Sequence, residues 1–136
     1  MNIPFLDLKA QYKSIKPEIE TAIKRVIDSQ YFVLGQELES FEKEFAKYLG
    51  VKYVVGVNSG TDGLILALLS LGIGKGDEVI TPANSFIATT NAIFQIGAKP
   101  ILVDCNLHTY QINIKRVEEA VTKKTKAILP VHLYGA

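Results

Sequence analysis

The stretch YVVGVNSGTDGLILALLSLG, residues 53–72, joins two different backbone patterns with no linker between them. Residues 54–57, VVGV, are typical of a strand, and residues 60–71 form an apolar run typical of a helix. Small polar residues and two glycines, NSGTDG, occupy positions 58–63. The stretch therefore predicts a tight strand-to-helix turn whose composition needs an explanation.

Two interpretations of residues 59–63, SGTDG, remain open from these residues alone. The first N–H groups of a helix lack intrahelical acceptors and carry positive partial charge, so glycine and hydroxyl residues there can bind a phosphate. Equally, Ser59 or Asn58 can simply cap the helix. The stretch is not a P-loop, because no Gly-Lys-Ser/Thr follows. The sequence GIGKG, residues 72–76, lies between a helix and a strand, which is the wrong context for a dinucleotide-binding motif.

Helix and strand patterns continue on both sides of this turn. Ser14 is expected to cap a first helix with an apolar face from Ile15 to Ile27, and Gly50 to end a second helix. The further predicted ranges are helix 36–49, strand 52–57, helix 60–71, strand 78–81, helix 85–95, strand 100–104, helix 114–121 and strand 126–131. Strands that alternate with helices predict an α/β fold with a parallel sheet covered on both faces.

Composition narrows the possible functions. The chain has 136 residues, the usual size of one domain, and a formal net charge of +1, which gives no electrostatic reason to expect nucleic acid or an acidic membrane as partner. With one cysteine, Cys105, it can form no internal disulfide or cysteine zinc site. Residues 1–7 do not look like an export signal and residues 79–98 are too polar to span a bilayer, so we expect a soluble cytoplasmic protein.

Two further places could carry chemistry. Phe86 follows a predicted strand end near the same sheet edge as the Gly60 turn, where its ring could stack on a planar ligand, although a core position is the better interpretation of this residue alone. The second place contains Asp104, Cys105 and His108, together with His132 and Tyr134 near residue 136. For the first three of these we favour structural roles, and no metal-ligand spacing or catalytic triad is present.

Taken in order, these motifs resemble the N-terminal part of the DegT/DnrJ/EryC1/StrS family of pyridoxal-phosphate-dependent sugar aminotransferases. The matching text is IPFLDLKAQY from residue 3, then residues 26–105 around YFVLG, NSGTDG and TPANSF, then AILPVHLYG. The resemblance implies part of the large domain of fold type I, a three-layer α/β/α structure with a mostly parallel sheet. Residues 1–50 would be its N-terminal helices and residues 51–136 its βαβ units, with no second domain and with the fold incomplete.

The resemblance also implies roles for particular residues. Gly60 and Thr61 would bind the phosphate of pyridoxal 5′-phosphate, and Phe86 would stack on its ring. Tyr31, Phe32 and residues 5–7 would lie near the sugar-nucleotide entrance. His132 and Tyr134 would lie near the cofactor pocket without an assigned role, and no metal site is expected.

The implied reaction transfers an amino group, expected from glutamate, to a keto-deoxy sugar on a nucleotide diphosphate, in a homodimer. The family's Schiff-base lysine and the acid that pairs with the pyridine nitrogen have no counterpart in this sequence. We therefore expect no catalytic residue here, no activity from the 136 residues alone, and a predicted strand 52–57 separated from its sheet partners. A sugar dehydratase of the same family and a non-catalytic anion-binding or regulatory module remain alternatives.

Overall fold

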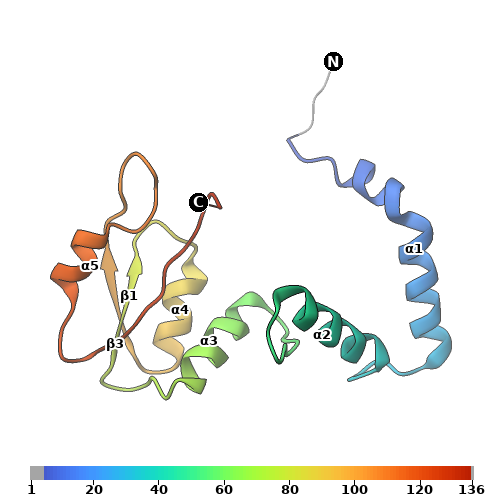
Figure 1. Cartoon of the computed structure of the whole chain (residues 1–136), viewed down its shortest axis with the longest axis horizontal. Helices are drawn as coiled ribbons and strands as arrows, with labels where there is room; N and C mark the ends of the chain where they lie inside the picture. Colours follow the sequence, from blue (N-terminus) through green and yellow to red (C-terminus); the bar gives the residue numbers. More distant parts are fainter. Residues whose placement is uncertain (1–4, 136) are drawn as a thin grey trace. The chain divides into compact units, whose positions relative to one another are not determined.

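The computed structural model describes residues 5–135 as two compact units, one extending to Gly56 and the other beginning at Val57 (Figure 1). Each unit is described by itself. Ile3 and Pro4, which open the N-terminal motif, lie outside the described residues.

The first unit begins with helix α1 (Leu8–Ser29), which starts earlier than the predicted cap at Ser14. Asp7 is the N-cap, because its carboxylate accepts a hydrogen bond of 3.0 Å from the N–H of Ala10. The Ser14 hydroxyl instead donates to the carbonyl of Gln11 inside the helix, so the predicted cap was wrong. The helix ends at Gln30, which adopts the left-handed conformation with φ of 57°.

Helix α2 (Gln36–Leu49) confirms the second predicted helix, including its end at Gly50. Gly50 has φ of 68°, a left-handed conformation in which glycine avoids the strain of a Cβ atom. Arg25 of α1 donates to both carboxylate oxygens of Glu37 of α2, at 2.7 and 3.0 Å. This exposed pair lowers the pKa of Glu37 and raises that of Arg25, mainly through the hydrogen bonds between them.

The predicted strand 52–57 was wrong, since these residues join no ladder in the structure. The N–H of Gly56 donates to the carboxylate of Glu42 at 2.7 Å, and a Cβ at Gly56 would lie 2.7 Å from Leu38. The segment therefore lies against α2 and uses a side chain as acceptor. A strand needs a neighbouring strand to satisfy its backbone groups, and no strand pairs with residues 52–57 within residues 5–135.

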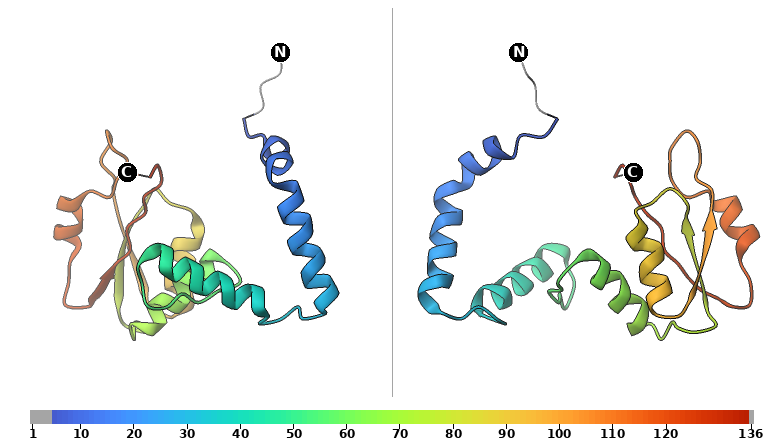
Figure 2. Two further views of the ribbon diagram at one scale, coloured as in Figure 1. Left: turned by 45° about the vertical axis from the view of Figure 1, so that its right-hand side comes forward. Right: turned by 180° about the vertical axis from the view of Figure 1, so that it is seen from behind.

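The second unit is a parallel sheet with helices on both sides (Figures 1 and 2). Its elements are α3 (Gly60–Ser70), β1 (Glu78–Pro82), α4 (Ile87–Gln95), β2 (Lys99–Val103), α5 (Ile114–Ala120) and β3 (Thr125–Ile128). The strand order is β2-β1-β3, with both pairs parallel. This confirms the predicted α/β class and the crossover connections that parallel strands require.

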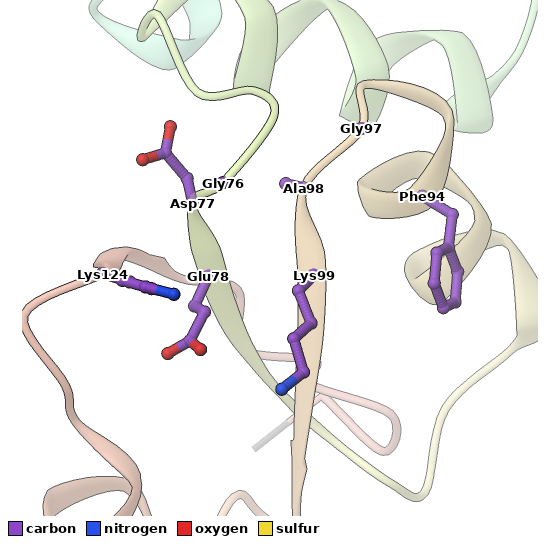
Figure 3. A pocket seen from close by; sticks show the side chains of 8 residues that line it. All are labelled: Gly76, Asp77, Glu78, Phe94, Gly97, Ala98, Lys99 and Lys124. Carbon is purple, nitrogen blue, oxygen red and sulfur yellow. The ribbon is translucent and has the colours of Figure 1, made fainter.

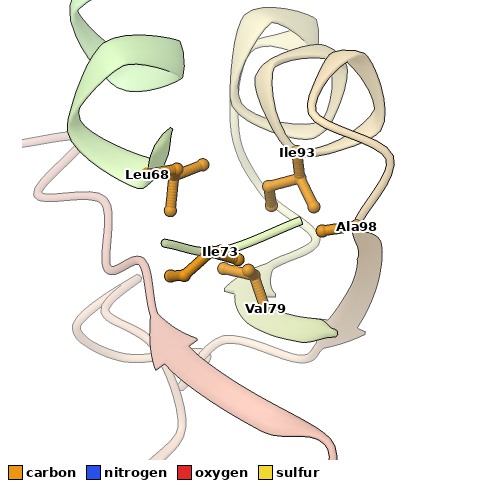
Figure 4. Packing of buried hydrophobic residues seen from close by; sticks show 5 residues of the cluster. All are labelled: Leu68, Ile73, Val79, Ile93 and Ala98. Carbon is orange, nitrogen blue, oxygen red and sulfur yellow. The ribbon is translucent and has the colours of Figure 1, made fainter. Parts of the chain in front are cut away.

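Two apolar clusters lie on opposite faces of β1. On one face Val79 packs with Leu68 of α3 and Ile93 of α4, together with Ile73 and Ala98 (Figure 4). On the other face Ile80 packs with Val103 of β2 and Val117 of α5. All five residues of β1 are buried, as expected of a strand covered on both faces, whereas the edge strands β2 and β3 are partly exposed. Coverage on both faces is thus confirmed for β1 only.

Several element boundaries differ from the predicted ranges, and two of these differences have identifiable reasons. Helix α4 begins at Ile87 rather than residue 85, because Phe86 has extended backbone angles and occupies the N-cap. Strand β3 ends at Ile128 rather than residue 131, shortly before Pro130, which has no N–H to donate to a ladder.

Ile80 of β1 and its register partner Ile128 of β3 give a direct test of this core, because the first side chain is buried and the second is half exposed. We expect Ile80→Ala to lower the free energy of unfolding by about 3 kcal/mol, because it leaves a cavity in a fully buried cluster. Ile128→Ala, at a side chain that is 51% exposed, is expected to cost less than about 1 kcal/mol. Urea unfolding followed by circular dichroism measures both, and equal losses would contradict the assignment of β1 as the central buried strand.

Candidate functional site

Residues 59–63 form a capped helix N-terminus at the start of α3. The Ser59 hydroxyl accepts from the N–H of Asp62 at 3.1 Å and donates to its carboxylate at 3.0 Å. The Ser59 carbonyl accepts from the N–H of Gly63 at 3.0 Å. Of the two candidate caps, Ser59 and Asn58, the structure therefore has Ser59 as the N-cap of this helix.

The cap leaves two N–H donors of the first turn unused. Within residues 5–135, neither the Gly60 nor the Thr61 N–H has a hydrogen-bond acceptor, as helix geometry requires for these positions. A Cβ placed at Gly60 would meet no atom within 4 Å, so the space in front of its backbone is open. An anion can approach both N–H groups, and the Thr61 hydroxyl adds a third possible donor.

The charge at this turn has two opposing contributions. The N-terminus of α3 carries positive partial charge, while the Asp62 carboxylate places a negative charge in the same first turn. Residues 58–63 contain no lysine or arginine. Any anion bound here would therefore be held by backbone dipoles and hydroxyl groups rather than by a cationic side chain of this stretch.

Phe86 is presented to solvent by the loop that follows β1. Its side chain is 74% exposed, so the core interpretation favoured from the sequence was wrong. The loop is fixed beneath it, since Ala83 donates to the Val103 carbonyl at 2.9 Å and the hydroxyls of Ser85 and Thr89 share a hydrogen bond of 2.7 Å. The ring is thus an exposed aromatic face on a fixed backbone.

The helices that follow Gly60 and Phe86 pack against each other, but the candidate site residues themselves are not in contact. Helices α3 and α4, which begin at Gly60 and directly after Phe86, pack against each other. No hydrogen bond or ring contact connects Phe86 with Gly60 or Thr61 in the described part of the chain. A ligand that bound to Gly60, Thr61 and Phe86 together would have to span the distance between the start of α3 and the Phe86 ring.

Residues 104–113 after β2 form a loop closed by backbone contacts, and the structural roles favoured for Asp104, Cys105 and His108 stay predictions. Cys105 forms an antiparallel bridge with Ile112, and the Asp104 carbonyl accepts from Asn113 at 3.1 Å. The N–H of His108 donates to the Asn106 side chain at 2.8 Å. An open hollow of about 760 Å³ lies beside this loop. No cluster of three or more metal-ligating side chains occurs among residues 5–135.

Comparison with known proteins identifies the family. The sequence profile of the DegT/DnrJ/EryC1/StrS aminotransferase family matches residues 13–136. The chain belongs to this family. It is 50% identical over 133 residues to dTDP-3-amino-3,4,6-trideoxy-alpha-D-glucose transaminase of Streptomyces venezuelae, covering 98% of this chain and 35% of that protein.

Solved structures of family members share the fold. A crystal structure of S. venezuelae DesV matches with a TM-score of 0.94 and 50% identity, over 98% of this chain and 36% of that chain. A structure of Escherichia coli GDP-4-keto-6-deoxy-D-mannose-3-dehydratase with bound hydrated PLP matches with a TM-score of 0.79 and 39% identity, over 85% of this chain and 31% of that one. The chain thus spans about a third of the length of the relatives that it matches.

Within this family member, the segment after β3 contains an aromatic contact that the sequence did not indicate. The Tyr134 ring lies edge-on to Tyr110, with centroids 5.6 Å apart and an interplanar angle of 70°. The His132 carbonyl accepts from the N–H of Gly135 at 3.0 Å. Tyr110 has φ of 56°, a rare conformation for a tyrosine that is invisible in a sequence pattern. This contact joins the loops that follow β2 and β3.

The remaining features lie away from these residues. A shallow pocket of about 390 Å³ at the amino ends of β1 and β2 contains Glu78, Lys99 and Lys124 (Figure 3). Glu78 accepts from the Thr122 hydroxyl at 2.6 Å, which ties β1 to the segment before β3. Tyr31 and Phe32 are exposed in the first unit. Among residues 5–135, no helix has the length and apolar character needed to cross a bilayer.

The cap of α3 can be tested independently of any ligand. Ser59→Ala is expected to lower the free energy of unfolding by about 1 kcal/mol, because the N–H of Asp62 loses its acceptor. Ser70→Ala is the matched control, since Ser70 donates only to the carbonyl of Ala67 at the other end of the same helix. Its expected effect is within about 0.5 kcal/mol. A urea titration that gave both variants the same stability would argue against the cap.

Proposed function

We propose that this chain is the cofactor-phosphate part of a pyridoxal-phosphate-dependent aminotransferase that acts on a keto sugar. The observation that carries the proposal is the open N-terminus of α3, where Gly60 and Thr61 keep free N–H donors even though Ser59 caps the helix. Membership of the DegT/DnrJ/EryC1/StrS aminotransferase family supports it.

The residues present fit the cofactor. A phosphate monoester is an anion that accepts hydrogen bonds, which suits the N–H groups of Gly60 and Thr61 and the Thr61 hydroxyl. A pyridine ring is flat and largely apolar on its faces, which suits the exposed ring of Phe86. Pyridoxal phosphate supplies the carbonyl group and the electron sink that amino-group transfer needs. Gly60 and Thr61 would hold its phosphate, and Phe86 would orient the ring and shield one face from water.

Proton transfer would require groups outside this chain. No lysine of the sequence occupies the family's lysine motif, and the acid that pairs with the pyridine nitrogen has no counterpart here. We place both in the two thirds of the relatives' length that these residues do not match. In this proposal the 136 residues bind the cofactor without turning substrate over.

The substrate class rests on the relatives. The S. venezuelae relative is named as a transaminase of a dTDP-linked amino sugar, which supports a nucleotide-diphosphate keto sugar as acceptor. We further propose glutamate as the amino donor, a homodimeric enzyme in the cytoplasm, and neither nucleic acid nor membrane as partner. Because the matched E. coli enzyme is a sugar 3-dehydratase, a dehydratase remains the second candidate, to be decided by the residue at the lysine position.

A simple anion-binding module explains less of the structure. It would account for the open N-terminus of α3, but it would have no use for a phenylalanine ring that the loop after β1 presents to solvent. The exposed ring therefore favours a ligand that combines a phosphate with a flat ring.

Binding of pyridoxine 5′-phosphate tests these roles without interference from lysines, because this analogue has no aldehyde. Thr61→Ala is expected to weaken its binding about tenfold, through loss of one hydrogen bond to a charged group, and to leave the binding of pyridoxine unchanged. Phe86→Ala is expected to weaken the binding of both ligands, because stacking does not depend on the phosphate. Isothermal titration calorimetry measures both effects.

The matched controls for these variants lie on α4. Thr90→Ala and Phe94→Ala remove the same side chains from exposed or half-buried positions of one helix, and both are expected to bind like the unchanged chain. Unchanged binding in both Thr61→Ala and Phe86→Ala would refute the assigned cofactor roles.

The mass of the protein from its native source tests the proposal that the cofactor-binding lysine lies outside these 136 residues. After borohydride reduction with pyridoxal phosphate, we expect a mass well over twice 15.0 kDa with one reduced cofactor on a lysine. An unmodified native product of 15.0 kDa would instead refute the proposed transamination and favour the anion-binding module.

A further inference from the structure

The N-cap of helix α4 is not the residue that local preferences favour. Phe86 occupies it with extended backbone angles, φ of −71° and ψ of 148°, and its side chain makes no capping hydrogen bond. The preceding residue, Ser85, is of a type that caps helices well, and the sequence predicts a helix from residue 85. Local preference and structure therefore disagree by one residue beside the exposed Phe86 ring, and such disagreement is typical of a functional position.

The hydroxyl of Ser85 is held by Thr89 instead of by the helix end. Its Oγ lies 2.7 Å from the Thr89 Oγ1 in a hydrogen bond, and within residues 5–135 it caps no N–H of α4. Thr89 is only 6% exposed, so the surrounding side chains fix the position of its hydroxyl. The N–H of Thr89 also donates to the carbonyl of Phe86 at 3.1 Å. Thr89 thus binds both Ser85 and Phe86.

Other helical hydroxyl groups of this chain are used differently. A serine or threonine inside a helix commonly donates to a carbonyl three or four residues earlier. Thr90 on the same helix donates in this way to the carbonyl of Ile87 at 3.0 Å, and Thr21 and Ser70 do so in α1 and α3. Thr89 instead binds a side chain that would otherwise be free to cap the helix.

Release of Ser85 would move the start of α4. A capping Ser85 would accept from the N–H of Ile87 or Ala88 and would place Phe86 in the first helical turn. The ψ angle of Phe86 would then change from 148° to about −42°. Because the loop before it is anchored by the backbone hydrogen bond of Ala83, this change would turn the Phe86 ring away from its present direction.

We propose that Thr89 is a positioning residue for the Phe86 ring. By binding the Ser85 hydroxyl, it keeps Ser85 from capping α4, so that Phe86 stays in an extended conformation with its ring exposed. The inference rests on the proposed function in one respect, the stacking of this ring on the cofactor ring. The backbone conformation of Phe86 is measured without any ligand, so a failure of the inference is distinguishable from a failure of the proposed function.

Substitutions at Thr89 separate the effect of its hydroxyl from that of its shape. Thr89→Val removes the hydroxyl and keeps the branched shape, Thr89→Ala removes both, and Thr89→Ser keeps the hydroxyl. The double variant Ser85→Ala/Thr89→Val also removes the competing cap. Thr90→Val is the matched control on the same helix, because the Thr90 hydroxyl binds only the Ile87 carbonyl. Circular dichroism verifies the helix content of each variant.

The Cα and Cβ chemical shifts of Phe86 report whether its backbone is extended or helical. In Thr89→Val and Thr89→Ala we expect these shifts to move toward helical values, and calorimetry to show about fivefold weaker pyridoxine binding through loss of the stacked ring. Thr89→Ser and Thr90→Val are expected to behave like the unchanged chain. The double variant is expected to regain extended shifts and to bind pyridoxine within about twofold of the unchanged chain, because alanine is a poor cap.

Recovery in the double variant distinguishes positioning from a loss of stability. If the double variant binds pyridoxine as weakly as Thr89→Val, the proposal is overturned, because a destabilised helix would not recover on losing a second hydroxyl. Extended Phe86 shifts in both Thr89→Val and Thr89→Ala would overturn it directly. Helical shifts in these variants with unchanged pyridoxine binding would support the positioning of Phe86 and would instead contradict ring stacking in the proposed function.

Discussion

The parallel pairing of β1 with a strand on each side is the constraint from which the second unit follows. A parallel strand cannot be reached by a short turn, so each connection crosses over through a helix, and α4 and α5 lie on opposite faces. With β1 buried on both faces, polar groups and irregular backbone are displaced to the strand ends. The loops after the carboxyl ends of β1 and β2 are therefore where exposed side chains such as Phe86 gather.

The turn at the start of α3 shows how one short stretch can serve structure and binding together. Ser59 takes the N–H groups that a cap normally takes, those of Asp62 and Gly63. The two N–H groups that this cap does not reach, at Gly60 and Thr61, have no acceptor within residues 5–135, and Gly60 has no Cβ atom beside them. The alternatives of cap and anion site are thus not exclusive, because they use different donors of the same helix end.

The first unit depends on contacts of a different kind. Helices α1 and α2 are joined by the exposed pair of Arg25 and Glu37. The segment after α2 is held by the hydrogen bonds from Val51 to the Ala46 carbonyl and from Gly56 to Glu42. Exposed ion pairs contribute little to stability, and α1 has no buried residue among those described. The chain matches about a third of the length of these relatives.

The sequence by itself determined what is local. The periodicity of residues 36–49, the glycine at position 50 and the alternation of helices and strands after residue 60 depend on neighbours within a few residues, and the structure has them as predicted. Of the two candidate caps for the helix after residue 59, Ser59 is the one that the structure has. Short-range patterns also placed Gly60, Thr61 and Phe86 as candidates, although their cofactor roles remain predictions. The misjudged cap at Ser14 was also local, since Asp7 already caps the same helix seven residues earlier.

Only the tertiary structure decided which backbone groups and side chains contact each other when they lie far apart in the sequence. Residues 52–57 have the composition of a strand, but a strand forms only beside another strand, and their Gly56 N–H binds Glu42 instead. The exposure of Phe86 and the contact between Tyr110 and Tyr134 likewise depend on what lies next to them in space. Strand pairing and burial each require a second segment in contact with the first, and a local sequence pattern describes only the first segment.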